Sequence, residues 1–324
     1  MITLKGINKT FRVARRKAGL RSAVKALFSR EHEIIHALRD VSFTIGDGEM
    51  VGYIGPNGAG KSTTIKIMCG ILTPDGGLCE IDGRFPWRER VAHVREIGVV
   101  FGQRSQLWWD VPVIDSFELI RDIYRVDGKT YANNLSELTE LLDLGEILKT
   151  PARSLSLGQR MRCEITASLL HGPRTLFLDE PTIGLDAVSK IAVRQFIRRL
   201  NLERGTTVIL TTHDMQDIEA LTERIILIGK GRILLDGSLA ELKRRSSERK
   251  TLVVEYGGSA PEICEGMTVS ESKESRLVIT LDPAILPVSD AIAHLSSQIE
   301  ITDVSVTGIT AEEMVAALYK EYSI

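Results

Sequence analysis

The chain has 324 residues, of which 43% are hydrophobic and 26% charged, and its formal net charge is -2 at pH 7. This composition is typical of a globular protein and excludes a disordered, collagen-like or disulfide-stapled chain. The small net charge gives no general attraction to nucleic acid or anionic lipid. A length above the ~100–200 residues of one domain predicts a large domain and a smaller one.

No apolar run reaches the ~20 residues that a membrane span requires, and the first residues lack the pattern of a signal peptide. We therefore expect a protein that is neither secreted nor able to cross a membrane by itself. The four cysteines lack the close spacing of a zinc or redox site, so we expect reduced thiols; they are Cys69, Cys79, Cys163 and Cys264.

Strands are predicted over residues 2–7 and 41–45, with a basic insertion over about 12–36. From Lys9 to Arg30 the sequence has eight Lys and Arg residues and no acidic residue. Apolar residues at helical spacing predict a short amphipathic helix over 20–28. Three uses of this segment stay open: a solvated surface helix, a contact with anionic lipid headgroups, or a contact with a membrane partner.

Strands and helices then alternate, which predicts a parallel sheet with helices on its faces. The expected strands are 51–54, 97–101, 175–178, 207–211, 225–228 and 232–236. The expected helices are 62–71, a largely helical block over 113–148, 161–171 and 187–203.

We place the first domain at residues 1–242, with a helical part over about 105–170. The polar stretch 243–250 is the predicted linker. Residues 251–324 form a predicted α+β domain, with strands over 252–256, 277–281 and 301–306 and helices near 289–298 and 311–322.

A phosphate-binding loop is the clearest motif, and it stands between an apolar strand and a helix. Glycines let backbone N–H groups surround an anion, and the helix adds the positive end of its dipole. Lys61 is expected at the β- and γ-phosphates and the Ser62 hydroxyl at Mg²⁺, with Thr63 in the same nucleotide-binding set. The loop consists of Gly55, Pro56, Asn57, Gly58, Ala59, Gly60, Lys61 and Ser62.

Two adjacent carboxylates follow the apolar strand at 175–178, at the sheet edge where ligands of parallel sheets bind. Asp179 can hold Mg²⁺ or its water. Glu180 can accept a proton from the attacking water, because neighbouring side chains point in different directions.

Residues 155–160 read Leu-Ser-Leu-Gly-Gln-Arg and resemble the signature motif of ABC ATPases. The motif departs from the family pattern at Leu157, where glycine is usual, and keeps Ser156, Gly158 and Gln159. In that family the signature faces the nucleotide held by the phosphate loop of a second copy. The resemblance covers residues 1 to about 242.

Further residues match the family in order and spacing. By resemblance, Gln103 senses Mg²⁺ and the attacking water, Asp186 communicates across the dimer, and His213 contacts the γ-phosphate. The family also stacks adenine on an aromatic residue near the N-terminus. Phe11 is the candidate here, and Tyr53 is the weaker one because it lies within a predicted core strand.

The resemblance implies an α/β fold. It has a P-loop NTPase core with a parallel sheet, an antiparallel β subdomain and a helical signature subdomain, plus the small C-terminal α+β domain. The function implied is that of an ATP-hydrolysing subunit of an ABC transporter, with ATP and Mg²⁺ bound between two copies arranged head to tail. The resemblance also implies a separate multi-span permease as the partner and a location at the cytoplasmic face of the membrane. The C-terminal domain resembles accessory domains of drug and polysaccharide exporters, which favours export over import.

Alternatives remain at this point. A soluble ABC ATPase could remodel nucleic acid or ribosomes, and a regulatory protein could bind nucleotide with little turnover. The Trp108-Trp109 pair fits either core packing or a contact with the permease.

Overall fold

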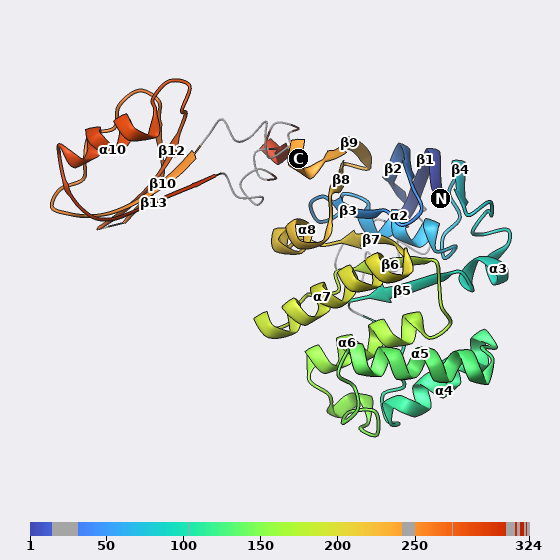
Figure 1. The fold of residues 1–324 in the computed structure, drawn as a ribbon. Coiled ribbons are helices and arrows are strands. Elements are labelled where there is room, and N and C mark those ends of the chain that lie inside the picture. Colours follow the sequence, from blue (N-terminus) through green and yellow to red (C-terminus); the bar gives the residue numbers. More distant parts are fainter. Residues whose placement is uncertain are drawn as a thin grey trace, which may run out of the picture. The chain divides into compact units, whose positions relative to one another are not determined.

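The computed structural model describes residues 1–14, 32–102, 104–241, 250–273 and 275–308, together with 315, 318–320 and 322. It contains two compact units, Met1–Asp236 and Gly237–Ile324 (Figure 1). Four predictions lie wholly or mostly outside the described residues. They are Gln103, the amphipathic helix at 20–28, the linker at 243–250 and the helix at 311–322.

An antiparallel sheet forms one part of the first unit, in the order β2-β1-β4. Its strands are β1 (Ile2–Ala14), β2 (His32–Ile45) and β4 (Gly76–Ile81). β1 and β2 pair from Ile2 opposite Ile45 to Ala14 opposite His32. The strands predicted at 2–7 and 41–45 are therefore too short, and both ends of the predicted insertion belong to this ribbon. The paired segments at 12–13 and 33–36 are exposed to solvent on both faces of the sheet. Their sequences therefore lack the alternation of apolar and polar residues that predicts a strand.

A six-stranded sheet forms the centre of the first unit, in the order β5-β6-β7-β3-β8-β9. Each pair of adjacent strands from β5 to β8 in this order is parallel. The strands are β3 (Met50–Ile54), β5 (Ile97–Phe101), β6 (Thr175–Asp179), β7 (Thr207–Thr211), β8 (Arg224–Gly229) and β9 (Arg232–Ser238). All residues of β7 and nearly all of β3, β6 and β8 are buried, as expected for parallel strands covered on both faces.

Helices accompany these strands. They are α2 (Lys61–Met68), α3 (Arg90–Val94), α4 (Val113–Tyr124), α5 (Gly128–Leu141), α6 (Leu157–Leu169), α7 (Ala187–Arg204) and α8 (Met215–Leu221), with a 3₁₀ turn η1 (Ala152–Ser154). α6 packs on α4 and α5 to form a helical layer (Figure 1). The predicted α/β fold is confirmed, with parallel and antiparallel sheets in one unit.

Helix α6 begins at Leu157, whereas the sequence predicted a start at 161. The Ser156 hydroxyl accepts a hydrogen bond from the Gln159 backbone N–H (3.2 Å), and the Gln159 side-chain oxygen accepts one from the Ser156 N–H (2.9 Å). This capping box satisfies two donors that would otherwise be unpaired, and it starts the helix within the signature.

The second unit holds an antiparallel sheet in the order β11-β12-β10-β13 and a helix, α10 (Val288–Ser296). The strands are β10 (Lys250–Gly257), β11 (Met267–Lys273), β12 (Arg276–Leu281) and β13 (Glu300–Gly308). α10 and the sheet enclose a small separate core that includes Leu252, Ile279 and Leu295. The sequence did not predict β11, because Met267 is the one buried residue of that strand.

All four cysteines are free, and three of them are buried. Among the helices that the structure describes, none combines the length and the apolar character needed to cross a bilayer.

Candidate active site

The phosphate loop occupies residues 55–60, between β3 and α2. Gly60 has φ 115°, and a Cβ added there would lie 2.8 Å from the Ala37 carbonyl oxygen of β2. Gly60 is thus required both for its left-handed backbone and for a close approach to the antiparallel sheet. Gly58 also has a positive φ, but the space around it is open, so its requirement is conformational.

Lys61 is buried and lies back over the loop that precedes it. Its Nζ donates hydrogen bonds to the carbonyl oxygens of Gly55 (2.6 Å) and Pro56 (3.1 Å). Burial lowers the pKa of Lys61, and the nearby carboxylates of Glu180 and Asp179 oppose that shift. The structure therefore brings the ammonium group, the loop and both predicted carboxylates into one electrostatic environment.

The first turn of α2 presents the remaining residues of this motif. Ser62 is exposed and Thr63 is half-buried, so the Ser62 hydroxyl is open to a ligand. Thr64 instead points inward, where its hydroxyl donates to the Gly60 carbonyl oxygen (3.1 Å) and meets the Tyr53 hydroxyl (3.1 Å).

Asp179 and Glu180 lie at the carboxyl end of β6. The Thr211 hydroxyl of β7 donates to Asp179 Oδ1 at 2.5 Å, and the Glu180 N–H donates to the Thr211 carbonyl oxygen at 2.9 Å. Glu180 has φ 56°, a left-handed conformation that is uncommon outside glycine. Its backbone therefore leaves the strand direction directly after Asp179, which separates the two carboxylates.

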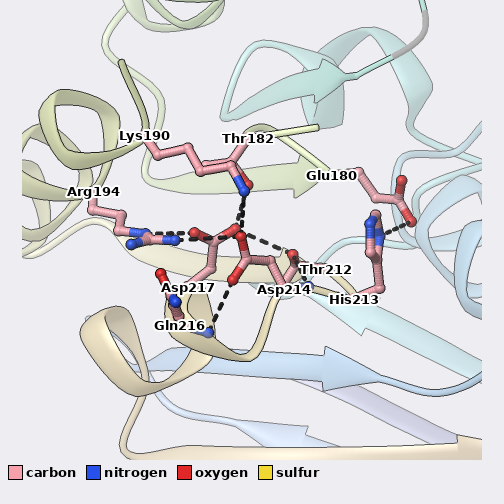
Figure 2. A network of polar contacts seen from close by, with 9 residues as sticks. All are labelled: Glu180, Thr182, Lys190, Arg194, Thr212, His213, Asp214, Gln216 and Asp217. Carbon is pink, nitrogen blue, oxygen red and sulfur yellow. Dashed lines mark hydrogen bonds and ion pairs between the residues drawn. The ribbon is translucent and has the colours of Figure 1, made fainter. Parts of the chain in front are cut away.

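His213 follows β7, the strand next to β6. Its Nδ1 lies 3.3 Å from Glu180 Oε1, and its side chain is 65% exposed (Figure 2). An accessible imidazole beside a partly buried carboxylate can orient a water or a phosphate oxygen between them. These two residues stand 33 positions apart in the sequence, and the parallel pairing of β6 and β7 brings them together.

The signature motif packs against Asp186. Ser189 of α7 donates to Asp186 from its backbone N–H (2.9 Å) and from its hydroxyl (2.7 Å), and these bonds lower the pKa of Asp186. A Cβ added to Gly158 would come within 2.4 Å of the Ser189 hydroxyl oxygen. Leu157, the departure from the family pattern, is 36% exposed. Its side chain would lie 2.9 Å from a Cβ at Gly184.

Phe11 stands on β1 opposite Ile35 of β2, and the Lys9 ammonium lies 5.7 Å from its ring centroid. Ala37, two positions along β2 from Ile35, contacts Gly60 of the phosphate loop. Phe11 thus lies on a ribbon that touches this loop. Tyr53 is fully buried, so its ring has no free face on which a base could stack.

Gln103 lies outside the described residues, but the residue before it is bound to the backbone of Asp179. The Gly102 N–H donates to the Asp179 carbonyl oxygen at 2.8 Å. A Cβ at Gly102 would lie 2.5 Å from the Glu180 carbonyl oxygen.

The predicted alternative of core packing for both tryptophans is wrong. Trp108 is 59% exposed and Trp109 49% exposed. The Arg160 guanidinium lies 5.4 Å from the Trp109 ring centroid, so the signature helix supports this loop from one side.

Glu164 of α6 was not singled out in the sequence. Its side chain is buried, and it accepts hydrogen bonds from the Ser105 hydroxyl and from the Gln106 N–H (3.0 Å). Burial raises the pKa of Glu164, and these donors oppose that shift. One buried carboxylate thus ties the signature helix to the segment that leads into the tryptophan pair.

A second group missed in the sequence is a network of charges beside His213 (Figure 2). Asp217 is fully buried and accepts from Arg194 Nε at 2.5 Å. Asp214 accepts from Lys190 Nζ at 2.5 Å. Burial alone would raise the pKa of Asp214, but Lys190 and the other partners hold it below its usual value. A local signal existed in the spacing of the two cations on α7 and of the two carboxylates, one at the N-cap of α8 and one within that helix.

A phosphate loop at a helix N-terminus, two carboxylates at the carboxyl edge of a parallel sheet and a histidine beside one of them define a P-loop nucleotide hydrolase. Comparison with known proteins narrows this class. The family model described as ABC transporter matches residues 38–183.

The chain is 31% identical to the ABC transporter ATP-binding protein NatA of Bacillus subtilis over 216 residues, 66% of this chain and 87% of NatA. It is 31% identical to the daunorubicin resistance ATP-binding protein DrrA3 of Streptomyces coeruleorubidus over 281 residues, 86% of each protein. The dimeric post-hydrolysis structure of the ATP-binding cassette MJ0796 bound to ADP and Pi matches with TM-score 0.61 and 29% identity. That match covers 74% of this chain and 99% of the cassette.

The chain therefore belongs to the family of ABC transporter ATP-binding proteins. It is an ATPase of the ABC type, as its signature motif indicated.

Proposed function

We propose that this chain is the ATP-hydrolysing subunit of an ABC exporter and acts as a head-to-tail dimer on a separate membrane permease at the cytoplasmic face. One observation carries the exporter assignment. The match to the daunorubicin-resistance protein spans 281 residues, whereas the first unit ends at Asp236, so the likeness extends into the second unit. That relative is named for drug resistance, and the second unit is the part that the shared ATPase core does not explain.

Within one chain, we propose that the loop at 55–60 and Lys61 hold the triphosphate. Lys61 is the cation best placed for the β- and γ-phosphates, because its Nζ already lies against the loop carbonyls. Phosphate oxygens can then take the place of these carbonyls as partners of the ammonium group. Phe11 is proposed to stack on the adenine base.

Glu180 is proposed as the general base, and His213 as the residue that orients the attacking water and the γ-phosphate. The 3.3 Å separation of their side chains supports this division of roles. Gln103 is proposed to contact the same water and Mg²⁺.

The oxygens present fit Mg²⁺. Ser62 and Asp179 offer the hard oxygen ligands that this ion prefers, and Mg²⁺ is usually held by one or two carboxylates together with substrate phosphates. Among the described residues, no group of three or more His, Cys, Asp or Glu side chains could hold a metal without a substrate. Bound there, Mg²⁺ would neutralise charge on the β- and γ-phosphates.

The second copy is proposed to close the site with Ser156, Gly158 and Gln159, whose helix N-terminus would face the γ-phosphate. Asp186 lies against this motif and would communicate between the two sites. Removal of the γ-phosphate deletes the charge that both copies bind, so hydrolysis would loosen the dimer and change the conformation of the permease.

Co-purification tests the assignment. The tagged full chain, isolated from detergent-solubilised membranes of its own host, is expected to bring with it a multi-span protein, and the pair is expected to show ATPase activity. In sealed vesicles with ATP outside, the transported compound is expected to accumulate inside. Recovery from the soluble fraction with ribosomes or nucleic acid would instead support a soluble remodelling ATPase.

A further inference from the structure

Asp217 of α8 joins two loops that approach the site from different strands. Its Oδ2 accepts hydrogen bonds from the hydroxyls of Thr182 and Thr212, the latter at 3.2 Å (Figure 2). All three residues are buried, and Asp217 is fully so. One carboxylate oxygen is thus shared by two hydroxyls that belong to separate segments of the chain.

Each of the two threonines lies close in sequence to a residue of the proposed active site. Thr182 stands two residues after Glu180 on the segment that leads to Asp186, and Thr212 stands directly before His213. The bond from Thr182 fixes the segment that carries the carboxylate, and the bond from Thr212 fixes the segment that carries the imidazole.

The other oxygen of Asp217 is held by α7. Arg194 Nε donates to Oδ1 at 2.5 Å, and the Arg194 terminal nitrogen reaches Asp214 Oδ2 at 3.4 Å. Asp186 caps the N-terminus of the same helix. The charge of Asp217 is therefore paired, which a buried carboxylate requires, and its position is tied to the helix that follows Asp186.

We propose that Asp217 is a positioning residue for ATP hydrolysis. It sets the distance between Glu180 and His213, and it links both to the helix that begins after Asp186. Hydrogen bonds to a charged group are roughly twice as strong as neutral ones, so they can hold both loops in place. This inference rests on the proposed roles of Glu180 and His213.

Paired substitutions of the two threonines test the proposal in the purified full chain. Thr182→Val and Thr212→Val keep the shape of the side chain and remove the hydroxyl, whereas Thr182→Ser and Thr212→Ser keep the hydroxyl. Because a misplacement of 1 Å can cost ~10²-fold in rate, we expect each Val variant to lower kcat by roughly tenfold. KM for ATP is expected to stay within about twofold, and the Ser variants to retain kcat within about twofold.

A matched control separates positioning from stability. Asn201, at the other end of α7, donates to the carbonyl oxygens of Gly48 and Thr206, both at 2.8 Å. Asn201→Ala removes two partly buried hydrogen bonds of the same helix, so it is expected to lower the unfolding temperature while kcat stays at the parental value.

Asp217→Asn is expected to lower kcat at least as much as either Val variant. If it does not fold, the comparison of Val with Ser decides. Val variants with a lower unfolding temperature and parental kcat would overturn the proposal, as would a raised KM with unchanged kcat. The role of Glu180 is tested separately: a Glu180→Gln variant that hydrolyses ATP at the parental rate would remove the assigned base. The measured kcat of the threonine variants would remain interpretable in that case.

Discussion

Gly158 at the start of α6 lies so close to Ser189 of α7 that a methyl group at position 158 would come within 2.4 Å of the serine hydroxyl oxygen. The same hydroxyl donates to Asp186 at 2.7 Å. The signature motif and Asp186 are therefore joined through one side chain, and displacement of either must affect the other.

Gly158→Ala tests this contact. The added Cβ is expected to push Ser189 aside and to disturb Asp186, so ATPase activity should fall by at least about tenfold, a typical cost of misplaced active-site groups. ATP binding to the isolated subunit should be unchanged. Ser189→Gly added to Gly158→Ala removes the clash while the backbone N–H at 189 remains, so part of the activity should return. A double variant as inactive as Gly158→Ala would show that the contact with Ser189 is not the cause.

Glu180→Gln removes the proposed base and keeps the size of the side chain. We expect kcat to fall by ~10²–10⁴-fold, the usual contribution of a general base, with ATP affinity retained. Two copies should then remain associated in ATP, which size-exclusion chromatography can detect. Glu203→Gln, on the surface of α7 beside Arg199, is the matched control and should turn over at the parental rate. Parental turnover in Glu180→Gln would refute the assignment.

Lys61→Ala removes the cation that lies against the phosphate loop. Because a hydrogen bond to a charged group contributes ~1.5–3 kcal/mol, we expect the Kd for ATP to rise by at least about tenfold. Equilibrium binding of labelled ATP measures this change without any need for hydrolysis. Lys66→Ala on the same helix serves as the control for the lost charge and should bind ATP as the parent does. Equal affinities in the two variants would contradict the role of Lys61.

The features that the sequence predicted correctly are encoded over short distances. The buried strands β3, β5, β6 and β7 are continuous apolar runs, and glycines with Lys61 follow directly after one of them. Asp179 and Glu180 follow another, and the carboxyl ends of neighbouring parallel strands meet at one edge. Local pattern and the rule for parallel sheets were sufficient there.

The features that were missed depend on tertiary contacts or lack an apolar pattern. Ser105 and Glu164 are 59 residues apart, and Thr182 and Asp217 are 35 apart, so neither pair gives a local signal. The outer parts of β1 and β2 and most of β11 are exposed, so their strands have no buried face to set a period. The exposure of Trp108 and Trp109 could not be predicted either, because tryptophan suits both cores and interfaces.

Glu164→Ala should loosen the loop that carries two of the three tryptophans of the chain. The Ser105 hydroxyl and the Gln106 N–H would lose their acceptor at a cost of ~1–3 kcal/mol. In a Trp87→Phe background, acrylamide should quench the fluorescence of Trp108 and Trp109 more strongly in Glu164→Ala than in the parent. Glu164→Gln keeps an acceptor oxygen and should show a smaller change. Equal quenching of the parent and Glu164→Ala would contradict the role of this carboxylate.

Two histidines, one buried and one half-buried, should make the stability depend on pH. Burial lowers the pKa of His171 to about 4, although the ring also donates a hydrogen bond from Nε2 to the Ile97 carbonyl oxygen (2.9 Å), which opposes that shift. Burial also lowers the pKa of His93. At pH values between the folded pKa of each histidine and its unfolded pKa of about 6.5, the unfolded chain binds more protons than the folded chain. Stability is therefore expected to fall as pH drops through this window, by up to ~3 kcal/mol for His171.

Chemical denaturation at pH 7, 6, 5 and 4.5 measures this slope. His171→Gln cannot titrate and should show a shallower fall in the free energy of unfolding than the parent. The comparison uses the slope alone, because the substitution also removes the stacking of His171 on Tyr124. Parallel slopes in the two proteins would contradict the assignment to His171.

The left-handed backbone of Glu180 has a consequence for how this protein can change over time. A residue other than glycine in that conformation costs roughly 1–2 kcal/mol, so replacement by glycine should relieve this cost while lowering turnover by ~10²–10⁴-fold, as expected for Glu180→Gln. Selection for the stability of the folded chain alone would therefore favour glycine over glutamate at position 180. A descendant freed from the need to hydrolyse ATP is expected to lose this residue early and to gain thermal tolerance as it does so.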